Sequence, residues 1–166
     1  LIVWFLYWRM QKRNLNLSRE LGLQSVTAQI AGLSVILFGI FAVIEHFYGI
    51  YFDVQMPEAF IQFILSTPTW LALLSLVVAA PIMEEFIFRG FLFSQLRNTR
   101  LGGWGAIITT SFLWTIIHFQ YEPMILYVLF ILGILLGYLR YKYNSLYLVM
   151  GIHALNNTIP FIFGFE

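Results

Sequence analysis

The chain has 166 residues, of which 60% are hydrophobic and only 10% are charged. Soluble domains carry about a quarter charged residues, so this composition excludes an ordinary soluble protein and indicates a membrane protein. The absence of cysteine excludes disulfides, thiolate nucleophiles and cysteine-ligated metals, and the net charge of +1 gives no sign of a nucleic-acid partner, so none is expected.

Apolar stretches long enough to cross a bilayer alternate with short polar segments. Residues 1–8 are interpreted as the end of a span, because their charges follow the apolar run, whereas a signal peptide carries them before it. A spanning helix needs about 20 apolar residues. The further spans expected are 25–50, 69–96, 104–120, 124–139 and 145–163. The sequence predicts an all-α, polytopic transmembrane helical bundle of about five to six spans. It is expected to form one membrane domain over 1–166, with a core bundle at about 69–163.

The basic residues predict an orientation in the membrane. Eight of the nine lie in the segments 9–19, 97–100 and 140–142. The acidic residues Asp53, Glu58, Glu122 and Glu166 fall in the alternate loops. Cytoplasmic loops are enriched in Lys and Arg, so the basic loops are expected to be cytoplasmic. The short loops and small size favour a multi-pass protein of a bacterial cell membrane.

The span 69–96 contains three ionisable residues, which are costly inside a bilayer and mark a functional site by default. Glu85 and Arg89 are spaced i, i+4, with the acid first, which favours an ion pair. Glu84 lies about 100° around the helix and is the less compensated carboxylate, which suits a general base. The alternative is a purely structural ion-pair cluster. Pro81 is expected to kink the helix, because it cannot donate to the carbonyl of Val77.

Two later spans carry His118 and the pair His153 and Asn157. A single histidine in a span is as often a packing residue as a functional one. At about 1.5 Å per residue, however, these groups and Glu84 reach similar depths, so they can meet in one layer. His153 and Asn157 share a helix face and can both donate hydrogen bonds to an oxyanion. Asn156 points about 100° away and is expected to be a packing or loop-facing amide.

Three short elements together resemble the signature motifs of a known family. They are Glu84-Glu85-x-x-x-Arg89, Trp114-x-x-x-His118 and His153-x-x-x-Asn157. They resemble the CPBP family of intramembrane metalloprotease-like proteins, which comprises CAAX proteases and bacteriocin-processing or immunity proteins and is also called the ABI family. The resemblance covers about residues 69–160. It implies an all-helical intramembrane endopeptidase whose catalytic chamber opens toward the cytosol.

The resemblance also implies roles for the motif residues. Glu84 and His118 correspond to the pair that activates water, and His153 and Asn157 to the pair that stabilises the oxyanion. Glu85 and Arg89 correspond to supporting residues. The second motif more often carries phenylalanine where this chain has Trp114, a conservative aromatic change.

The residues themselves suggest the same water-activating chemistry. No serine, threonine or cysteine stands with a base in a way that favours a covalent acyl-enzyme. No cofactor is expected. A zinc site remains an alternative, with Glu84, His118 and His153 as ligands, although the sequence has no HExxH spacing.

Three functions follow as hypotheses. The first is a CAAX protease-like endopeptidase that acts on a membrane-associated protein or a peptide precursor. The second is a non-catalytic immunity protein or scaffold that binds and stabilises a membrane-protein partner. The third is a small proton-relaying transporter, which the absence of an inverted repeat disfavours. Glu45-His46 is expected to be an interfacial polar pair, and Gly133 with Gly137 a helix-packing contact.

Overall fold

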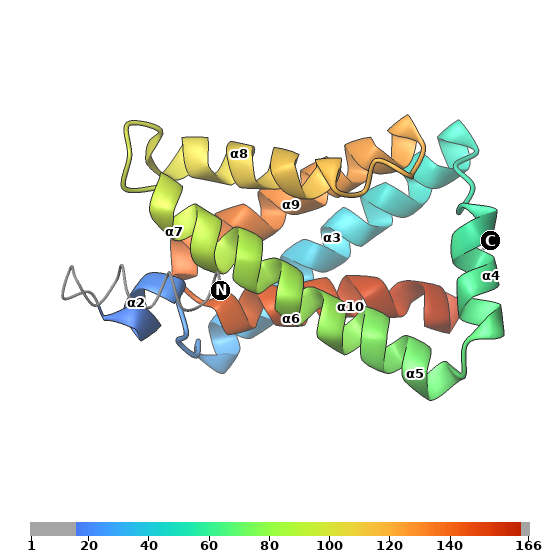
Figure 1. The fold of residues 1–166 in the computed structure, drawn as a ribbon, viewed down its shortest axis with the longest axis horizontal. Coiled ribbons are helices and arrows are strands. Elements are labelled where there is room, and N and C mark those ends of the chain that lie inside the picture. Colours follow the sequence, from blue (N-terminus) through green and yellow to red (C-terminus); the bar gives the residue numbers. More distant parts are fainter. Residues whose placement is uncertain (1–15, 164–166) are drawn as a thin grey trace.

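The structure is a computed structural model that describes residues 16–163, and these residues form helices and no strand (Figure 1). The short helices are α2 (Leu17–Leu21) and α4 (Glu58–Ser66). The long ones are α3 (Ala28–Phe52), a continuous helix over Thr69–Leu96, α8 (Gly102–Ile116), α9 (Pro123–Tyr143) and α10 (Leu146–Phe163). The predicted all-helical bundle is confirmed.

Four of these helices are long and apolar enough to cross a membrane: α3, Thr69–Leu96, α9 and α10. The helix α8 has 15 residues and would span only with its flanking turns. Together they agree with the expected five to six spans, and the leading segment 1–8 lies outside the described residues. The predicted span 104–120 ends earlier than expected, at Ile116, because the chain must turn before Pro123 opens α9.

The helix over Thr69–Leu96 alternates between α-helical and π-helical stretches. It runs through α5 (Thr69–Leu73), the π-helix η1 (Leu74–Ala79), α6 (Ala80–Glu85), the π-helix η2 (Phe86–Leu92) and α7 (Phe93–Leu96). Its π-type bonds include Ala80 N–H to the Ser75 carbonyl and Phe93 N–H to the Phe88 carbonyl. Short π-helical stretches inside α-helices are rare and often occur at functional sites.

Pro81 leaves a different carbonyl without a helical donor from the one predicted. In the π-helical spacing, the carbonyl that faces Pro81 belongs to Leu76, one residue before the Val77 that α-helical spacing indicates. Because proline has no N–H, this carbonyl needs another donor. Asn157 of α10 supplies it, with Nδ2 2.9 Å from the Leu76 oxygen. The irregular helix is thereby tied to α10.

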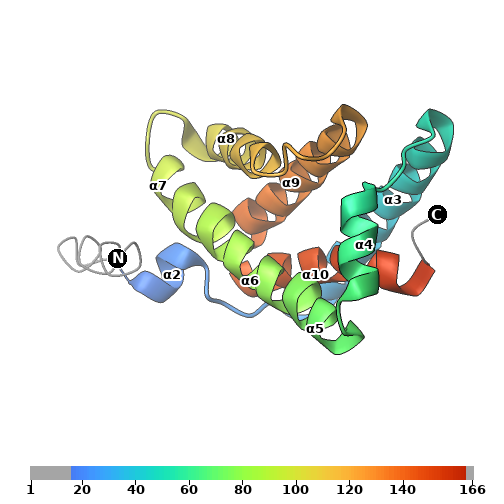
Figure 2. The ribbon, with the colours of Figure 1, turned by 45° about the vertical axis from the view of Figure 1, so that its right-hand side comes forward.

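The helices α8 and α9 pack closely through glycine, as predicted. A methyl group at Gly133 would lie 2.9 Å from Cβ of Ser111, and one at Gly137 would lie 3.0 Å from Cγ2 of Ile107. The helix α3 is peripheral by contrast, with only Ser34 and Phe38 buried along its length. Figure 2 shows it at the side of the bundle, where Tyr48 stacks on Tyr127 of α9 with 5.8 Å between the ring centres.

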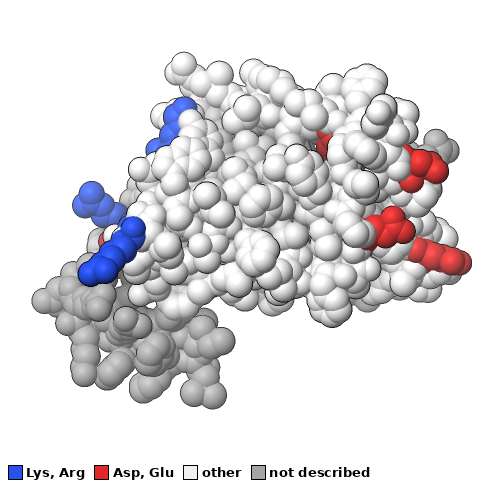
Figure 3. Space-filling view, turned by 90° about the horizontal axis from the view of Figure 1, so that it is seen from above, with Lys and Arg blue, Asp and Glu red and all other residues white. Residues whose placement is uncertain are grey.

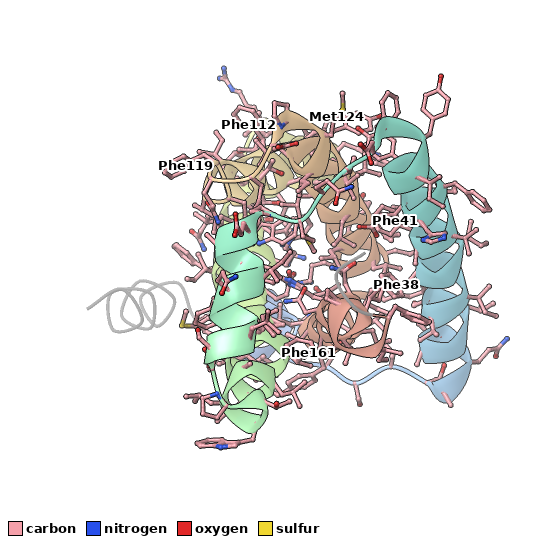
Figure 4. All side chains as sticks on the ribbon, turned by 90° about the vertical axis from the view of Figure 1, so that its right-hand side faces the viewer. Phe38, Phe41, Phe112, Phe119, Met124 and Phe161 are labelled. Atoms are coloured by element: carbon pink, nitrogen blue, oxygen red, sulfur yellow. The ribbon has the colours of Figure 1, made fainter. Side chains whose placement is uncertain are left out.

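Phenylalanine side chains show which faces are internal. In Figure 4, Phe38 and Phe41 point from α3 toward the rest of the bundle, whereas Phe112 and Phe119 point outward. Phe38 is 7% exposed and Phe119 is 79% exposed. Large apolar side chains are exposed on most of the helices, which suits a lipid environment.

Arg140 ties the segment 16–24 to the bundle. Its Nε donates to the Arg89 carbonyl and its Nη2 to the Glu20 carbonyl, each at 2.9 Å. Gly22, with φ of 71°, leaves the space that the guanidinium occupies, since a methyl group there would lie 2.5 Å from Cζ. The sequence counted Arg140 as a loop charge, but its side chain is fully buried, because it satisfies carbonyls rather than facing water.

Charge separates along the bundle. The pair Arg97–Glu20, at 3.3 Å, and the bond from Arg97 to Asn144 bring the ends of α7 and α9 and the segment 16–24 together, and we call this the basic end. The helix α4 and the turn before α9 meet at the other end, where Phe60 packs edge-on against Tyr121. We call this the acidic end. Figure 3 shows lysine and arginine gathered at one end and most acidic side chains at the other.

Candidate active site

A buried ion pair forms the base of the site. Nη1 of Arg89 lies 2.8 Å from Oε1 of Glu85, and both side chains are fully buried. The i, i+4 pair predicted from the spacing is therefore present. Nη2 of Arg89 also donates to the Gly133 carbonyl at 3.2 Å, and the guanidinium lies 4.7 Å from the centre of the Trp114 ring. Three helices thus hold the arginine in one position.

His153 lies between the two carboxylates. Its Nδ1 is 2.9 Å from Oε1 of Glu85, which fixes the ring, and its Nε2 is 3.9 Å from Oε2 of Glu84. The side chain is only 3% exposed. Glu84, Glu85 and Arg89 sum to a formal charge of −1, so a proton on His153 would bring this cluster to neutrality.

Glu84 has a partner that the sequence reasoning missed. Nε1 of Trp114 donates to Oε2 of Glu84 at 2.6 Å, so the carboxylate is not without compensation. The Trp114 side chain is buried, whereas 20% of the Glu84 side chain remains exposed. The only available signal was an indole where the family more often has phenylalanine. Glu84 is therefore held in one orientation while one side stays accessible.

His118 is placed differently from its predicted position. It lies beyond the end of α8, in the turn that leads to α9, and its Nδ1 is 2.9 Å from the Trp114 carbonyl. Because a carbonyl only accepts, the hydrogen of this bond lies on Nδ1, and Nε2 is left for other partners. The ring stacks on Tyr121, with 5.9 Å between the ring centres. The imidazole that the structure brings within 4.0 Å of Glu84 is that of His153 rather than His118.

The two asparagines of α10 lie beside this cluster. Nδ2 of Asn157 donates to the Leu76 carbonyl, which leaves its second N–H hydrogen for other partners. Nδ2 of Asn156 lies 3.4 Å from Oδ1 of Asn157. Both asparagines line the cavity described next. The expected packing or loop-facing role of Asn156 is therefore wrong, because the chain places it at the cavity wall.

A cavity of about 580 Å³ joins these groups to the acidic end. Its wall includes Glu84, His118 and His153. It also includes Glu45 and His46 of α3, which the sequence placed in an interfacial pair. Tyr121 lies at the wall in the turn before α9, and burial together with the negative Glu84 raises the pKa of its phenol. The phenol therefore keeps its proton at neutral pH.

The cavity reaches the surface at the acidic end. The exposed residues Asp53 and Gln55 form part of its wall, and the loop between α3 and α4 that carries them lies opposite the basic end (Figure 1). Two expectations therefore conflict. If the basic loops are cytoplasmic, the chamber opens away from the cytosol, whereas the family resemblance implies an opening toward it.

The structure also bears on the zinc alternative. Within residues 16–163, no three His, Asp or Glu side chains are grouped in a way that could hold a metal ion. Glu84 and His153 approach each other to 3.9 Å, but His118 is not grouped with them. Residues 16–163 therefore show no preformed three-ligand cluster, and a reaction without a cofactor stays a prediction.

Comparison with known proteins adds an independent observation. The family model described as "Type II CAAX prenyl endopeptidase Rce1-like" matches residues 65–159, which is more than half of the chain. The chain belongs to this family. The predicted resemblance is confirmed, and the matched range holds every predicted site residue. With four apolar helices long enough to cross a membrane among residues 16–163, the chain is an integral membrane protein.

Two curated relatives are similar to it. An "Uncharacterized 24.3 kDa protein" of Escherichia coli is 30% identical over 96 residues, which cover 57% of this chain and 44% of that protein. A protein of Bacillus subtilis (strain 168) named "Putative membrane peptidase YdiL" is 27% identical over 145 residues, covering 86% of this chain and 57% of that protein. The chain thus spans about half the length of the curated relatives it matches. No solved structure matches.

Proposed function

We propose that this protein is an intramembrane endopeptidase that hydrolyses a peptide bond in a membrane-associated protein or a peptide precursor. The observation that carries this proposal is the position of Glu84. It is a carboxylate held by Trp114 at the wall of a cavity large enough for a peptide segment, next to His153 and above a buried ion pair. Membership of a CAAX endopeptidase family supports the same chemistry.

Water activation is assigned to Glu84 with His118. Glu84 takes one proton from a water molecule, and the remaining hydroxide attacks the carbonyl carbon of the substrate. The free Nε2 of His118 accepts the second hydrogen of that water and orients it. The proton held by Glu84 then passes to the leaving amine, so the carboxylate returns to its starting state.

Stabilisation of the tetrahedral oxyanion is assigned to His153 and Asn157. With Nδ1–H bonded to Glu85, a protonated His153 presents its second N–H at Nε2. The remaining hydrogen of Nδ2 in Asn157 is the other donor. Donors fixed before the reaction contribute most when they face the developing charge. Glu85 and Arg89 support the site by holding His153 and the helices in place.

The finer assignment is a CAAX protease-like enzyme of a bacterial cell membrane, acting on secreted peptide precursors such as those of bacteriocins. The family match supports the reaction class, and the similar proteins of Escherichia coli and Bacillus subtilis support a bacterial host. An immunity or scaffold protein that only binds a membrane partner is the competing function. The presence of every motif residue supports the enzyme.

The test uses the purified protein in detergent and a library of candidate peptides. We expect the wild type to cleave a subset, and Glu84→Gln to cleave none of them. Cleavage should persist in strong chelators and in serine- and cysteine-directed reagents. A chelated enzyme that loses activity and regains it with zinc would overturn the metal-free mechanism. A folded wild type that cleaves nothing but retains a membrane partner would favour the scaffold.

A further inference from the structure

Among residues 16–163, the wall of the cavity beside Glu84 has carboxyl groups but no ammonium or guanidinium group. The carboxyl groups are those of Glu45, Asp53 and Glu84, and three histidines also line it. The carboxyl groups come from α3, from the loop that follows α3 and from α6. Charges in a cleft with low-dielectric walls interact more strongly than charges in water, so the interior should attract cations.

Glu45 is the carboxylate that the proposed reaction does not use. It lies within the apolar helix α3, outside residues 65–159 that match the family. The ion pairs found among residues 16–163 do not include it. An ionisable group within a spanning helix is costly to keep, and here it faces the same cavity as the reaction centre.

Aromatic side chains lie in the same part of the wall. Tyr48, Phe60 and Tyr121 all line the cavity, on α3, on α4 and in the turn before α9. Tyr48 follows Glu45 by one helical turn, and Phe60 meets Tyr121 edge-on at 6.3 Å. Carboxylates combined with aromatic faces are the chemistry that binds ammonium and guanidinium groups.

We propose that the cavity selects substrates that carry a cationic group close to the cleaved peptide bond, with Glu45 as a specificity-determining residue. The cation is either a lysine or arginine side chain or a free amino terminus. This inference rests on the proposed endopeptidase function. It also implies that an acidic side chain near the bond is disfavoured.

One peptide cleaved by the wild type serves as the template for the test. Lysine, leucine or glutamate is placed at successive positions around the bond, with both ends blocked. A second set has no charged side chain and compares a free with an acetylated amino terminus, which separates the two sources of the cation. We expect kcat/KM for lysine over leucine to reach about tenfold at one position, and to fall as salt is added.

Variants of the acidic residues test which carboxylate produces the preference for lysine. Glu45→Gln should lower the lysine-to-leucine ratio about tenfold while the leucine peptide is still cleaved, which shows that the variant folds. Glu122→Gln is the matched control, because Glu122 is exposed at the same end but lies outside the cavity wall. It should change the ratio less than about twofold. If Glu45→Gln cleaves nothing, Asp53→Asn takes its place, with the same direction expected.

The outcomes separate the two proposals. A wild type that cleaves the lysine, leucine and glutamate peptides equally would overturn cation selection and leave the endopeptidase standing. A preference for lysine that survives both Glu45→Gln and Asp53→Asn would overturn the assignment to these carboxylates. Absence of cleavage for every peptide would overturn the endopeptidase and cation selection with it.

Discussion

Glu84 and Glu85 are neighbours in the chain but have different surroundings. Glu84 faces the cavity, whereas Glu85 is buried between Arg89 and His153. Glu84→Gln should therefore lower kcat by about 10²–10⁴-fold, as expected for loss of a general base, while the thermal unfolding temperature stays close to that of the wild type. Peptide cleavage and differential scanning fluorimetry of the same preparations provide the measurement.

Glu85→Gln, the matching change at the neighbouring residue, should mainly lower stability, whereas Glu84→Gln should mainly lower activity. Glu85→Gln leaves Arg89 buried without its charge partner, which typically costs about 3–5 kcal/mol of stability. We expect a lower unfolding temperature and a lower yield from the membrane. A stable but inactive Glu85→Gln together with an active Glu84→Gln would exchange the two roles.

Trp114 contributes a hydrogen bond that phenylalanine cannot make. Trp114→Phe keeps an aromatic face over Arg89 but removes the Nε1 donor to Glu84. A hydrogen bond to a charged group contributes about 1.5–3 kcal/mol, although the partly exposed carboxylate can recover some of this from water. We expect a fall of about tenfold in kcat with KM nearly unchanged, because Glu84 loses its fixed orientation. A raised KM at constant kcat would instead make Trp114 a substrate-contacting residue.

At this scale the sequence predicted contacts within a helix better than contacts between helices. The i, i+4 spacing of Glu85 and Arg89 was enough to predict their ion pair, because helical geometry alone brings them together. The bond from Trp114 to Glu84 joins residues 30 positions apart. Depth along the span indicated that His118 and His153 could meet Glu84, but it could not tell which imidazole would be nearer.

The element scale shows how one proline shapes the site. Pro81 was expected to disturb its helix, but the π-helical spacing and the donation from Asn157 to Leu76 could not be predicted from a single segment. The position of His118 could not be predicted from a single segment either, because it depends on the short turn before α9. The end of α8 depends on where α9 can begin, so local periodicity placed the histidine inside a span that ends before it.

Gly133 offers a test of the contact between α8 and α9. Gly133→Ala would place a methyl group 2.9 Å from Cβ of Ser111 and 3.2 Å from Nη2 of Arg89. Such overpacking typically costs about 1–3 kcal/mol. We expect a lower unfolding temperature. We also expect some loss of activity, because the added methyl group would displace the Arg89 side chain that supports the site.

Gly151→Ala is the control for that change. Gly151 lies in α10, and a methyl group there would meet nothing within 4 Å. Alanine is the better helix former by about 1 kcal/mol, so this variant should be neutral or slightly more stable. Equal losses in both variants would show that helix propensity in the membrane, rather than the α8–α9 contact, determines the effect.

At the scale of the whole molecule, the separation of charge could be predicted from the sequence but the cavity could not. Alternating spans place loops on two sides, so the basic and acidic ends follow from the order of the helices. The cavity wall instead combines α3, α4, η1, α6, α8, α9 and α10 with two loops. Glu45 and His46 looked interfacial because their depth along α3 is near its outer end, and only the packing shows that this part of α3 faces the reaction centre.

The orientation of the bundle is the prediction with the widest consequence, and the absence of native cysteine makes it directly testable. Gln55 lies at the cavity mouth and Thr99 at the basic end, and both are exposed. The distribution of Lys and Arg predicts that Gln55→Cys reacts with an impermeant maleimide added outside intact cells. It predicts that Thr99→Cys reacts only after the membrane is permeabilised.

The same labelling decides where a substrate must enter. Reaction at position 55 from outside means that the peptide bond is presented from the extracytoplasmic side, because the cavity reaches the surface there. The reverse pattern, with position 99 labelled in intact cells, would show that the basic end faces outward and that the chamber opens to the cytosol. In that case the uneven distribution of Lys and Arg between the two ends would be too weak to set the orientation of the bundle. The family resemblance would then have predicted the opening of the chamber correctly.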